Sequence, residues 1–349
     1  ALGEAIREDG DPVLFIGSRR GLEGRLVPEA GFELEALDAR PLIGRSPLER
    51  VRGLLALAGA TLQARRLLRR FRADRVIAVG GYASAPAALA AVWCRIPMVL
   101  VNTDVAPGAA NRLLARFARR IFVGFEAAID RFGGLRDRVV HAGVPLRRSL
   151  RDAFALSGEG AGARRDGAPP RLFVFGGSQG ARQINDAMIA ALPGLREAWP
   201  ALEVVHQTGD EDRERVAAAY HAAGLRAEVL AFEPDMPARY RAADLVVCRA
   251  GAISIAELTL AGRPALLVPL AHVGGGEQFD NARVLEEAGA ARMLDPRELS
   301  DPRFAAALHA LLGDPKALAE MAAAAHSLAR PDAAERIVAA CRELEGSDQ

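Results

Sequence analysis

Short apolar runs alternate with helix-like stretches along the chain, and this alternation restricts the fold more than any other sequence feature. The runs are continuous rather than interleaved with polar residues, which is typical of parallel strands covered by helices on both faces. We expect strands at 13–16, 76–79, 97–101, 121–123 and 139–140, and in a second series at 172–175, 203–207, 228–232, 245–248, 265–269 and 292–294. The sequence therefore predicts an α/β protein with two doubly wound, Rossmann-like parallel-sheet domains facing a cleft.

A segment without apolar periodicity separates the two series of strands. Residues 157–170 are rich in Gly, Ala, Arg and Pro, which is typical of a linker. The length of 349 residues also suits two domains. We therefore expect an N-terminal domain over 1–156 and a C-terminal domain over 171–349.

Several classes of protein are excluded by composition. The three cysteines are too widely spaced for a disulfide framework or a zinc site: Cys94, Cys248 and Cys341. No apolar run approaches the ~18 residues that a membrane span needs. The charged residues at 7–9 occupy the place of the apolar region of a signal peptide. We expect a cytoplasmic protein without a metal or a cofactor.

The two halves of the chain differ in charge. Residues 1–150 carry 24 arginines against 15 acidic residues, a net charge of +9, and the remainder carries −8. Nine of these arginines lie between Arg45 and Arg75. The excess indicates an anionic partner such as nucleic acid, a phosphorylated ligand or a membrane surface. The alternative is a preference for arginine throughout, because Lys316 is the only lysine.

Residues 48–71 have the apolar spacing of an amphipathic helix. The first interpretation is that its apolar positions pack on the sheet: Leu48, Val51, Leu55, Ala58 and Leu62. The second is that the helix binds a membrane surface, with Leu54 and Leu57 in the interface and the flanking arginines on anionic lipid.

The sharpest local signal is a glycine-rich turn at 176–182, with the sequence GGSQGAR. It follows a predicted strand and opens a predicted helix. Glycines at such a turn let the backbone approach a ligand, and the start of the helix offers N–H groups to an anion, most often a phosphate. The turn lacks the spacing of GxGxxG and the Lys-Ser/Thr of a P-loop. The alternative is a turn that only packs strand against helix.

Two further glycine-bearing turns follow later strands of the second series. Residues 248–257 read CRAGAISIAE and place Glu257 on a helix, where it either complements the helix dipole or accepts hydrogen bonds from ribose hydroxyls. The third turn contains GGGEQ at 274–278. Three such turns at the carboxyl edge of one parallel sheet predict a nucleotide-sugar site. The acidic run at 210–212 is interpreted as a solvated helix start rather than a metal–nucleotide motif, and His206 as a core histidine.

These segments resemble the second domain of the MurG-type transferases of glycosyltransferase family 28. The first half of the chain has similar matches: GGYASAP at 80–86, PG and NR at 107–112, and GVPLR at 143–147. The matches run in order along nearly the whole chain. Members of this family transfer N-acetylglucosamine from UDP-N-acetylglucosamine to undecaprenyl-pyrophosphoryl-muramoyl-pentapeptide, which converts lipid I to lipid II in peptidoglycan synthesis.

The resemblance implies a GT-B fold, an inverting reaction and a donor held mainly by the second domain. The implied residues for UDP-N-acetylglucosamine are Arg147, Ser178, Gln179, Glu233, Ala252, Ile253, Ser254, Glu257 and Gln278. Among them, Glu257 would bind ribose, the backbone at 232–233 would bind uracil, and residues 252–254 would offer N–H groups to phosphate. Ser178 and Gln179 would face the diphosphate or sugar, Gln278 the sugar hydroxyls, and Arg147 would reach towards the donor.

The acceptor side departs from the family pattern. Its implied residues are Gly80, Gly81, Tyr82, Ser84, Asn102 and Asp104. The HEQN segment of the family reads VNTD at 101–104, so its glutamate becomes Asn102 and its asparagine becomes Asp104. The GGTGGH loop of the family is absent, and residue 1 matches the helix that follows it. We expect a fragment that lacks the loop histidine, binds UDP and transfers no sugar; Asp104 is the candidate base within the chain.

The resemblance therefore implies a hexosyltransferase that binds UDP-N-acetylglucosamine and an undecaprenyl-linked acceptor, and no nucleic acid. It implies a peripheral protein on the cytoplasmic face of the inner membrane, attached to an anionic surface. Two alternatives remain. One is a related transferase with a different lipid or alcohol acceptor, and the other is a catalytically silent UDP-sugar-binding protein.

Overall fold

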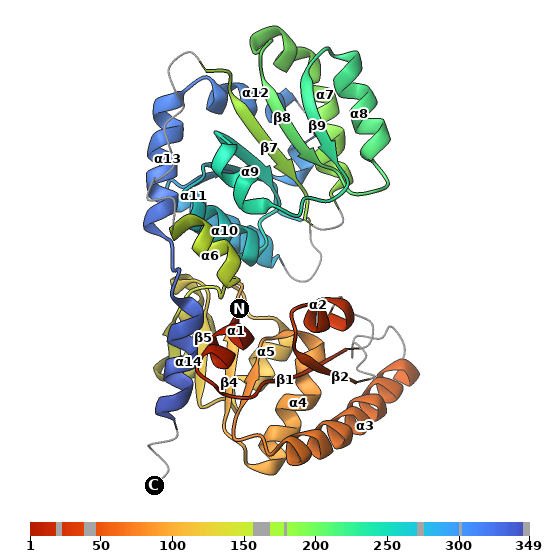
Figure 1. The fold of residues 1–349 in the computed structure, drawn as a ribbon, viewed down its shortest axis with the longest axis vertical. Helices are drawn as coiled ribbons and strands as arrows, with labels where there is room; N and C mark the ends of the chain where they lie inside the picture. Colours follow the sequence, from red (N-terminus) through yellow and green to blue (C-terminus); the bar gives the residue numbers. More distant parts are fainter. Residues whose placement is uncertain are drawn as a thin grey trace. The chain divides into compact units, whose positions relative to one another are not determined.

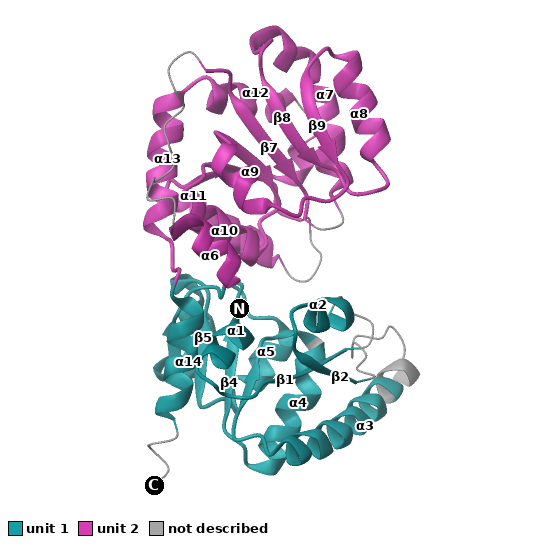
Figure 2. Cartoon of the chain, viewed as in Figure 1, with its two compact units in different colours: residues 1–145, 332–349 teal, residues 146–331 magenta. Residues whose placement is uncertain are grey.

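The computed structural model describes residues 1–18, 23–37, 47–155, 168–177, 180–270, 276–299 and 302–344. The chain divides into two compact units (Figure 2). Unit 1 contains residues 1–145 and 332–349, and unit 2 contains residues 146–331. Within the described ranges, no helix combines the length and hydropathy that a membrane span requires.

Unit 2 is a six-stranded parallel sheet covered by helices (Figure 1). Its strands are β7 (Arg171–Phe175), β8 (Glu203–Gln207), β9 (Arg226–Leu230), β10 (Leu245–Cys248), β11 (Ala265–Leu267) and β12 (Ala291–Met293). The order across the sheet is β12-β11-β10-β7-β8-β9, the doubly wound order that the sequence predicts. All six predicted strands are present.

The helices of unit 2 are α6 (Arg148–Ala155), α7 (Arg182–Ala198), α8 (Arg213–Ala222), α9 (Met236–Ala242), α10 (Ala252–Ala261), α11 (Glu277–Glu287), α12 (Pro302–Leu312) and α13 (Pro315–Ser327). A short 3₁₀ helix, η2, covers Pro296–Glu298. The core lies between α7, α12 and one face of the sheet, where Ile184 and Met188 of α7 pack with Leu172 of β7 and Leu308 of α12.

Unit 1 contains two separate parallel sheets. β1 (Leu14–Ser18) pairs with β2 (Glu33–Leu37), and the second sheet has the order β3 (Val76–Ala78), β4 (Met98–Asn102), β5 (Arg120–Val123) and β6 (Val139–His141). The sequence analysis missed β2, because its two glutamates break the continuous apolar pattern. Alternation of this kind is typical of a strand with one face in solvent.

The helices of unit 1 are α1 (Leu2–Glu8), α2 (Glu23–Glu29), α3 (Pro47–Phe71), α4 (Gly81–Cys94), α5 (Ala109–Leu114) and α14 (Ala333–Glu343), with the 3₁₀ segment η1 (Glu126–Arg138). The packing face of α3 differs from the first interpretation. Ala60, Ala64 and Leu67 are buried, whereas Leu55 and Leu62 are exposed. Buried small residues allow α3 to pack closely on α4, and this pairing leaves the leucine stripe facing solvent.

The two units differ from the predicted domains at both boundaries. Unit 2 begins at Leu146, so α6 precedes the segment that we interpreted as the linker. The last helix, α14, belongs to unit 1, where Ile337 and Cys341 pack against Phe122 of β5. Helical periodicity in a sequence identifies an apolar face but not the sheet that covers it.

Candidate active site

The candidate site of unit 2 lies where the strand order of its sheet reverses. β7 lies between β8, which follows it in sequence, and β10, which follows after a crossover. Such a reversal leaves a crevice at the carboxyl ends of the two central strands. Because β7 and β10 pair in parallel, their glycine-bearing turns lie at the same edge of the sheet. The tertiary structure therefore brings together two of the three turns that the sequence singles out.

The turn after β7 has conformations and contacts that require glycine. Gly177 and Gly180 have φ of +98° and +76°, in the left-handed region. A β-carbon on Gly180 would lie 1.9 Å from the carbonyl oxygen of Thr208, so only glycine lets the turn approach the end of β8 this closely. The Gly177 carbonyl oxygen accepts from the Gly180 N–H at 2.9 Å and from the Gln207 carboxamide at 2.9 Å. Two predicted donor-side residues lie outside the described residues: Ser178 and Gln179.

Asn185 of α7 joins this region to the end of β8 through a buried network. Its Nδ2 donates to the carbonyl oxygen of Thr208 at 3.1 Å and to the Asp212 carboxylate at 2.8 Å. Because its nitrogen donates both protons, Oδ1 accepts from His206 Nε2 at 3.1 Å. His206 Nδ1 then accepts from the Tyr220 hydroxyl at 3.1 Å. Burial lowers the pKa of His206 from 6.5 to about 3, and the ring is therefore neutral.

Asp212 is a structural member of this network, and the interpretation of a solvated helix start was wrong for it. The residue is buried, and Arg215 donates to its carboxylate from Nε at 3.0 Å and from Nη2 at 2.9 Å. Burial alone would raise the pKa of Asp212, but the hydrogen bonds from Asn185 and Arg215 outweigh it and lower the pKa. Among the residues that the structure describes, no cluster of three or more His, Cys, Asp or Glu could hold a metal ion.

The turn after β10 presents the start of a helix to the same edge. Gly251 precedes α10, and no side chain caps the helix at this end. The N–H groups of Ala252, Ile253 and Ser254 lie in the first turn, where they have no acceptor within the helix. Ala252 is buried, while the Ile253 side chain is 59% exposed. Donors in this arrangement suit an anionic group.

Arg249 is a component of the site that the sequence analysis overlooked. It is buried, and its guanidinium donates to the carbonyl oxygens of Val268 (3.2 Å) and Pro269 (3.1 Å) and to the Gln183 carboxamide (3.0 Å). Burial lowers the pKa of Arg249. All three acceptors are neutral, so the cation adds positive charge to the crevice while it joins three loops. The signal in the sequence was an arginine placed directly after an apolar strand and before a glycine-bearing turn.

Glu257 lies within the site, on the second turn of α10. Its Oε2 accepts from the Tyr240 hydroxyl at 2.9 Å. Burial raises the pKa of Glu257, while the hydrogen bond from Tyr240 and the charge of Arg147 act in the opposite direction. Arg147 is exposed and belongs to unit 2. Glu257 and Arg147, both predicted to bind the nucleotide sugar, therefore interact through their charges.

The Glu233 side chain has its partners within unit 2. Its side chain is buried, accepts from Arg239 Nε at 2.5 Å and accepts from the backbone N–H of Asp235 at 2.8 Å. The carboxylate is thus occupied within unit 2 and holds the loop after β9. The backbone at 232–233 stays the predicted contact, beside the exposed ring of Phe232.

Gln278 lies at the start of α11. Its Oε1 accepts from the backbone N–H of Leu270 at 2.9 Å, and residues 274–275 of the predicted turn lie outside the described residues. Asn281, one turn later, is fully buried and donates to the carbonyl oxygen of Ala250 at 3.2 Å. The third predicted turn is therefore tied to the second by a side chain of α11. The sugar contact of Gln278 stays a prediction.

The acceptor-side residues lie at the corresponding edge of unit 1. Gly80 and Gly81 have φ of +84° and +74°, and α4 begins at Gly81. Ser84 donates from Oγ to the carbonyl oxygen of Gly81 at 3.0 Å, as part of the first turn of α4. The Tyr82 side chain is outside the described part. These residues share one helix start, as the predicted motif requires.

Asn102 is committed to contacts within unit 1, which argues against the predicted contact with an acceptor. The residue is buried at the end of β4. Its Nδ2 donates to the carbonyl oxygen of Asp104 at 2.5 Å, and its Oδ1 accepts from Asn111 Nδ2 at 2.8 Å. Burial of an uncharged amide in place of the glutamate of the family avoids the cost of a buried charge. Asp104 is half-buried and stays the candidate base.

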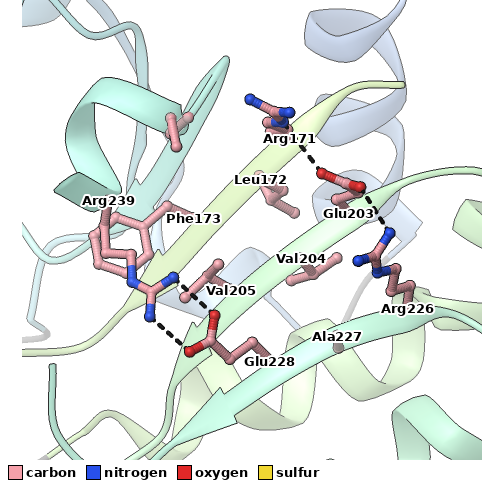
Figure 3. A pocket seen from close by; sticks show the side chains of 12 residues that line it. Arg171, Leu172, Phe173, Glu203, Val204, Val205, Arg226, Ala227, Glu228 and Arg239 are labelled. Carbon is pink, nitrogen blue, oxygen red and sulfur yellow. Dashed lines mark hydrogen bonds and ion pairs between the residues drawn. The ribbon is translucent and has the colours of Figure 1, made fainter. Parts of the chain in front are cut away.

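A pocket of about 330 Å³ lies elsewhere on unit 2, over the face of β7, β8 and β9 (Figure 3). Its charged groups pair with one another: Arg171 and Arg226 with Glu203 (3.1 Å each), and Arg239 with Glu228 (2.6 Å). These groups leave no unpaired charge in the described lining of the pocket, and the predicted site residues lie outside it. We therefore assign the candidate site to the carboxyl edge.

Comparisons with known proteins agree with this assignment. Residues 171–337 match the model of the glycosyltransferase family 28 C-terminal domain, and residues 1–123 match the model of its N-terminal domain. A relative from Pelobacter propionicus is 44% identical over 347 residues, covering 95% of this chain and 91% of its own. It is named UDP-N-acetylglucosamine–N-acetylmuramyl-(pentapeptide) pyrophosphoryl-undecaprenol N-acetylglucosamine transferase, as is a 43% identical relative from Anaeromyxobacter sp. (99% of this chain, 89% of its own).

Solved structures show the same fold. The crystal structure of Acinetobacter baumannii MurG has a TM-score of 0.79 and 27% identity, covering 98% of this chain and 94% of its own. A UDP-GlcNAc 2-epimerase from Neisseria meningitidis, with a TM-score of 0.68 and 14% identity, covers 98% of this chain and 95% of its own, and it shows likeness of fold alone. The predicted GT-B class and the predicted family are confirmed: the chain belongs to glycosyltransferase family 28.

Proposed function

We propose that the chain is the N-acetylglucosaminyltransferase that transfers N-acetylglucosamine, with inversion, from UDP-N-acetylglucosamine to the muramoyl 4-hydroxyl of undecaprenyl-pyrophosphoryl-muramoyl-pentapeptide. The names of the relatives that are 40–44% identical support this reaction. In the proposal, unit 2 binds the donor and unit 1 binds the acceptor.

One observation carries the donor assignment: a carboxylate, a helix start and a cation meet at the strand-order reversal. Glu257 follows the start of α10 on the same helix, and Arg249 lies directly before that helix. A carboxylate is the group that binds ribose hydroxyls, and N–H groups with a nearby cation are the groups that bind a diphosphate. The three groups follow one another along the chain directly after β10, in one turn and the helix that it opens.

The same groups supply the chemistry of the leaving group. Departure of UDP places negative charge on the diphosphate, and donors fixed in advance stabilise that charge without reorganising. The N–H groups of residues 252–254 and the guanidinium of Arg249 are held by backbone and by buried hydrogen bonds, so they meet this requirement. Asp104 is the group of this chain proposed to accept the proton from the acceptor hydroxyl.

The donor site is tested by replacing Glu257 with alanine. A hydrogen bond to a charged group contributes ~1.5–3 kcal/mol, so the dissociation constant for UDP should rise roughly 10- to 150-fold. Calorimetric titration measures it. The matched control is Glu214→Ala, which removes an exposed carboxylate from α8 of the same unit and should leave the constant unchanged. Equal affinity of the Glu257 variant and the parent would refute the site.

The acceptor is tested by turnover. The transferase proposal requires release of UDP that depends on an undecaprenyl-linked muramoyl-pentapeptide acceptor and is removed by Asp104→Asn, whereas the inactive fragment expected from the sequence would release none. Turnover only with another lipid or alcohol would support the alternative acceptor, for which the neutral pair of Asn102 and Asn111 is the structural argument. UDP binding without turnover on any acceptor would support the silent binding protein.

We also propose that unit 1 binds an anionic membrane surface through α3 and α4. One stripe of α3 carries Leu55, which is 68% exposed, together with Leu62, Arg66 and Arg69. On α4, Trp93 is 55% exposed, and the Arg65 guanidinium lies 4.5 Å from the centre of its ring. Apolar side chains flanked by arginines are typical of interfacial helices.

The structure selects the arginines for the membrane test. Arg70 forms an ion pair with Glu35 at 2.5 Å and Arg65 packs on Trp93, so we choose Arg66 and Arg69. At ~1 kcal/mol for each arginine near anionic lipid, Arg66→Glu with Arg69→Glu should weaken binding to phosphatidylglycerol-containing vesicles at least about 30-fold at low salt. The control is Arg213→Glu with Arg292→Glu, two exposed arginines of unit 2. Equal sedimentation of both double variants would contradict the docking surface.

A further inference from the structure

We propose that Tyr240 is a positioning residue of the donor site, which holds the Glu257 carboxylate in the orientation that receives the ribose. Nothing in the sequence singled out Tyr240, because it lies on α9, between β9 and β10 and outside the glycine-bearing turns. The inference rests on the proposed function, in which Glu257 binds the ribose, and it assigns Tyr240 as the residue that orients this carboxylate.

The ring of Tyr240 is fixed on all sides. The residue is 0% exposed. Phe173 and Phe175 of β7 contact it edge to face, with centroid distances of 5.9 and 6.1 Å and interplanar angles of 84° and 80°. Such contacts hold a ring in one orientation. The hydroxyl of Tyr240 is therefore aimed by the core of unit 2 rather than by the ligand.

The helix that carries Tyr240 is itself anchored at its start and to the sheet. The Asp235 side chain accepts from the Ala238 N–H at 3.1 Å and caps α9. Arg239, the neighbour of Tyr240, donates to Glu228 of β9 at 2.7 and 2.6 Å, as Figure 3 shows, and also to Glu233. These bonds leave α9 little freedom to move Tyr240 away from Glu257.

The hydroxyl acts on one oxygen of the Glu257 carboxylate. It donates to Oε2 at 2.9 Å, which leaves Oε1 as the oxygen that can accept from a ribose hydroxyl. A buried phenol whose pKa is raised well above 10.0 stays a donor at every pH of interest. A fixed donor stabilises the ionised carboxylate and restricts its rotation.

The protonation of Glu257 depends on few groups. Burial raises its pKa, and Tyr240 of α9 and Arg147, just before α6, lower it. Cys248 of β10 interacts with Glu257, but burial and that carboxylate raise the pKa of its thiol, so it stays neutral. The helices α6, α11 and α13 also pack on α10, and no ionisable group of their described residues is among those that shift this pKa. Tyr240 and Arg147 are therefore the two groups that oppose the effect of burial and lower the pKa of this carboxyl.

The test is Tyr240→Phe, which keeps the ring and removes the hydroxyl. We expect the dissociation constant for UDP-N-acetylglucosamine at pH 7.5 to rise about 10-fold. We also expect the loss of affinity at low pH to begin at a higher pH than in the parent, because the carboxylate loses a group that lowers its pKa. The nucleotide sugar is the probe since its diphosphate, esterified at both ends, does not titrate in this range. A purely structural role of Tyr240 would not shift the pH profile.

The chain offers a matched control in Tyr220→Phe. Tyr220 is also a buried tyrosine of unit 2 with a hydrogen-bonded hydroxyl, but its partner is His206. This variant should leave the pH profile unchanged. If Tyr240→Phe unfolds, 3-fluorotyrosine placed at position 240 keeps the shape and makes a stronger donor, and the acid limb should then move to lower pH.

The outcomes separate the two proposals. An unshifted acid limb in Tyr240→Phe, or with the fluorinated residue, would overturn the role of Tyr240 while Glu257→Ala still weakens binding. Failure of the parent chain to bind UDP-N-acetylglucosamine would instead overturn the proposed function. A shifted acid limb in Tyr240→Phe and not in Tyr220→Phe supports the inference.

Discussion

Each unit has a buried asparagine next to a glycine-bearing turn. The two asparagines differ in how many of their side-chain polar atoms have a hydrogen-bond partner. Asn185 of unit 2 is 1% exposed and uses its full hydrogen-bonding capacity on Thr208, Asp212 and His206. Asn111 of unit 1 is 8% exposed and donates to Asn102, while its buried Oδ1 has no partner in the described part of the chain.

The difference indicates how the two edges are held. The donor-side edge is fixed by a network that ends in a carboxylate and an arginine, so its geometry is set before any ligand binds. At the acceptor-side edge, the corresponding place among the described residues is taken by a neutral amide pair, Asn102 and Asn111. An incompletely satisfied amide stabilises a loop less than a complete network does, because buried polar groups cost free energy when they are unpaired.

The largest expected effect comes from replacing each asparagine with leucine. Asn185→Leu leaves two buried groups without a partner, the Thr208 carbonyl oxygen and His206 Nε2, while Asp212 keeps its bonds from Arg215. At ~1–3 kcal/mol for each unpaired group, the free energy of unfolding should fall by roughly 2–6 kcal/mol. Asn111→Leu removes an oxygen that is already unpaired and leaves one buried group, Asn102 Oδ1, without its donor, so the loss should be smaller, about 1–3 kcal/mol. The two tryptophans report the units separately in urea, Trp93 for unit 1 and Trp199 for unit 2, once the other is changed to phenylalanine. Equal losses would break the comparison.

Alanine substitutions at Gly180 and Gly80 sharpen the comparison between the two units. Gly180 and Gly80 both have positive φ, and Gly80 combines it with ψ of 179°, so the backbone conformation costs alanine roughly 1–3 kcal/mol at each position. At Gly180 the new β-carbon meets backbone at 1.9 Å, whereas at Gly80 it meets the Asn111 side chain at 2.9 Å. A side chain can move and a strand end cannot, so Gly180→Ala should cost about 3 kcal/mol or more in total. Thermal unfolding in which Gly80→Ala is the more damaging change would contradict the view of unit 2 as the more rigidly built edge.

The smallest expected effect is the loss of stability of unit 2 at low pH. Burial lowers the pKa of His206 to about 3, so below pH 6.5 the unfolded chain takes up a proton that the folded chain refuses. Stability is therefore present above pH 6.5 and is lost as the pH falls, by about 2 kcal/mol between pH 7 and 5. The Trp199 signal should show this loss, and His206→Gln should remove it. The exposed His326→Gln variant is the control, and an unaltered slope in His206→Gln would rule out this cause.

Much of the architecture could be predicted from the sequence. Continuous apolar runs gave all six strands of unit 2, because a parallel strand buried on both faces needs apolar residues at every position. The same rule missed β2, whose glutamates alternate with apolar residues at the edge of a sheet. Glycine turns after strands were visible for a related reason: backbone conformation and close approach restrict those positions to one residue type.

Side-chain partners were not predictable in the same way. Glu233 and Asn102 read as ligand contacts, yet the partners that occupy them, Arg239 and Asn111, come from other elements. Arg249 and Tyr240 went unnoticed, because a buried cation among carbonyls and a tyrosine aimed by two phenylalanines are arrangements of residues distant in sequence.

The sequence by itself determined the α/β class, the two series of strands, the glycine turns and the family, since each is written in local pattern and residue type. Only the tertiary structure decided which unit receives α14, which stripe of α3 faces solvent, and which oxygen of Glu257 accepts from Tyr240. The physical reason is that periodicity specifies a buried face and not its partner, whereas the direction and protonation of a buried polar group depend on atoms that folding brings within about 3 Å of it.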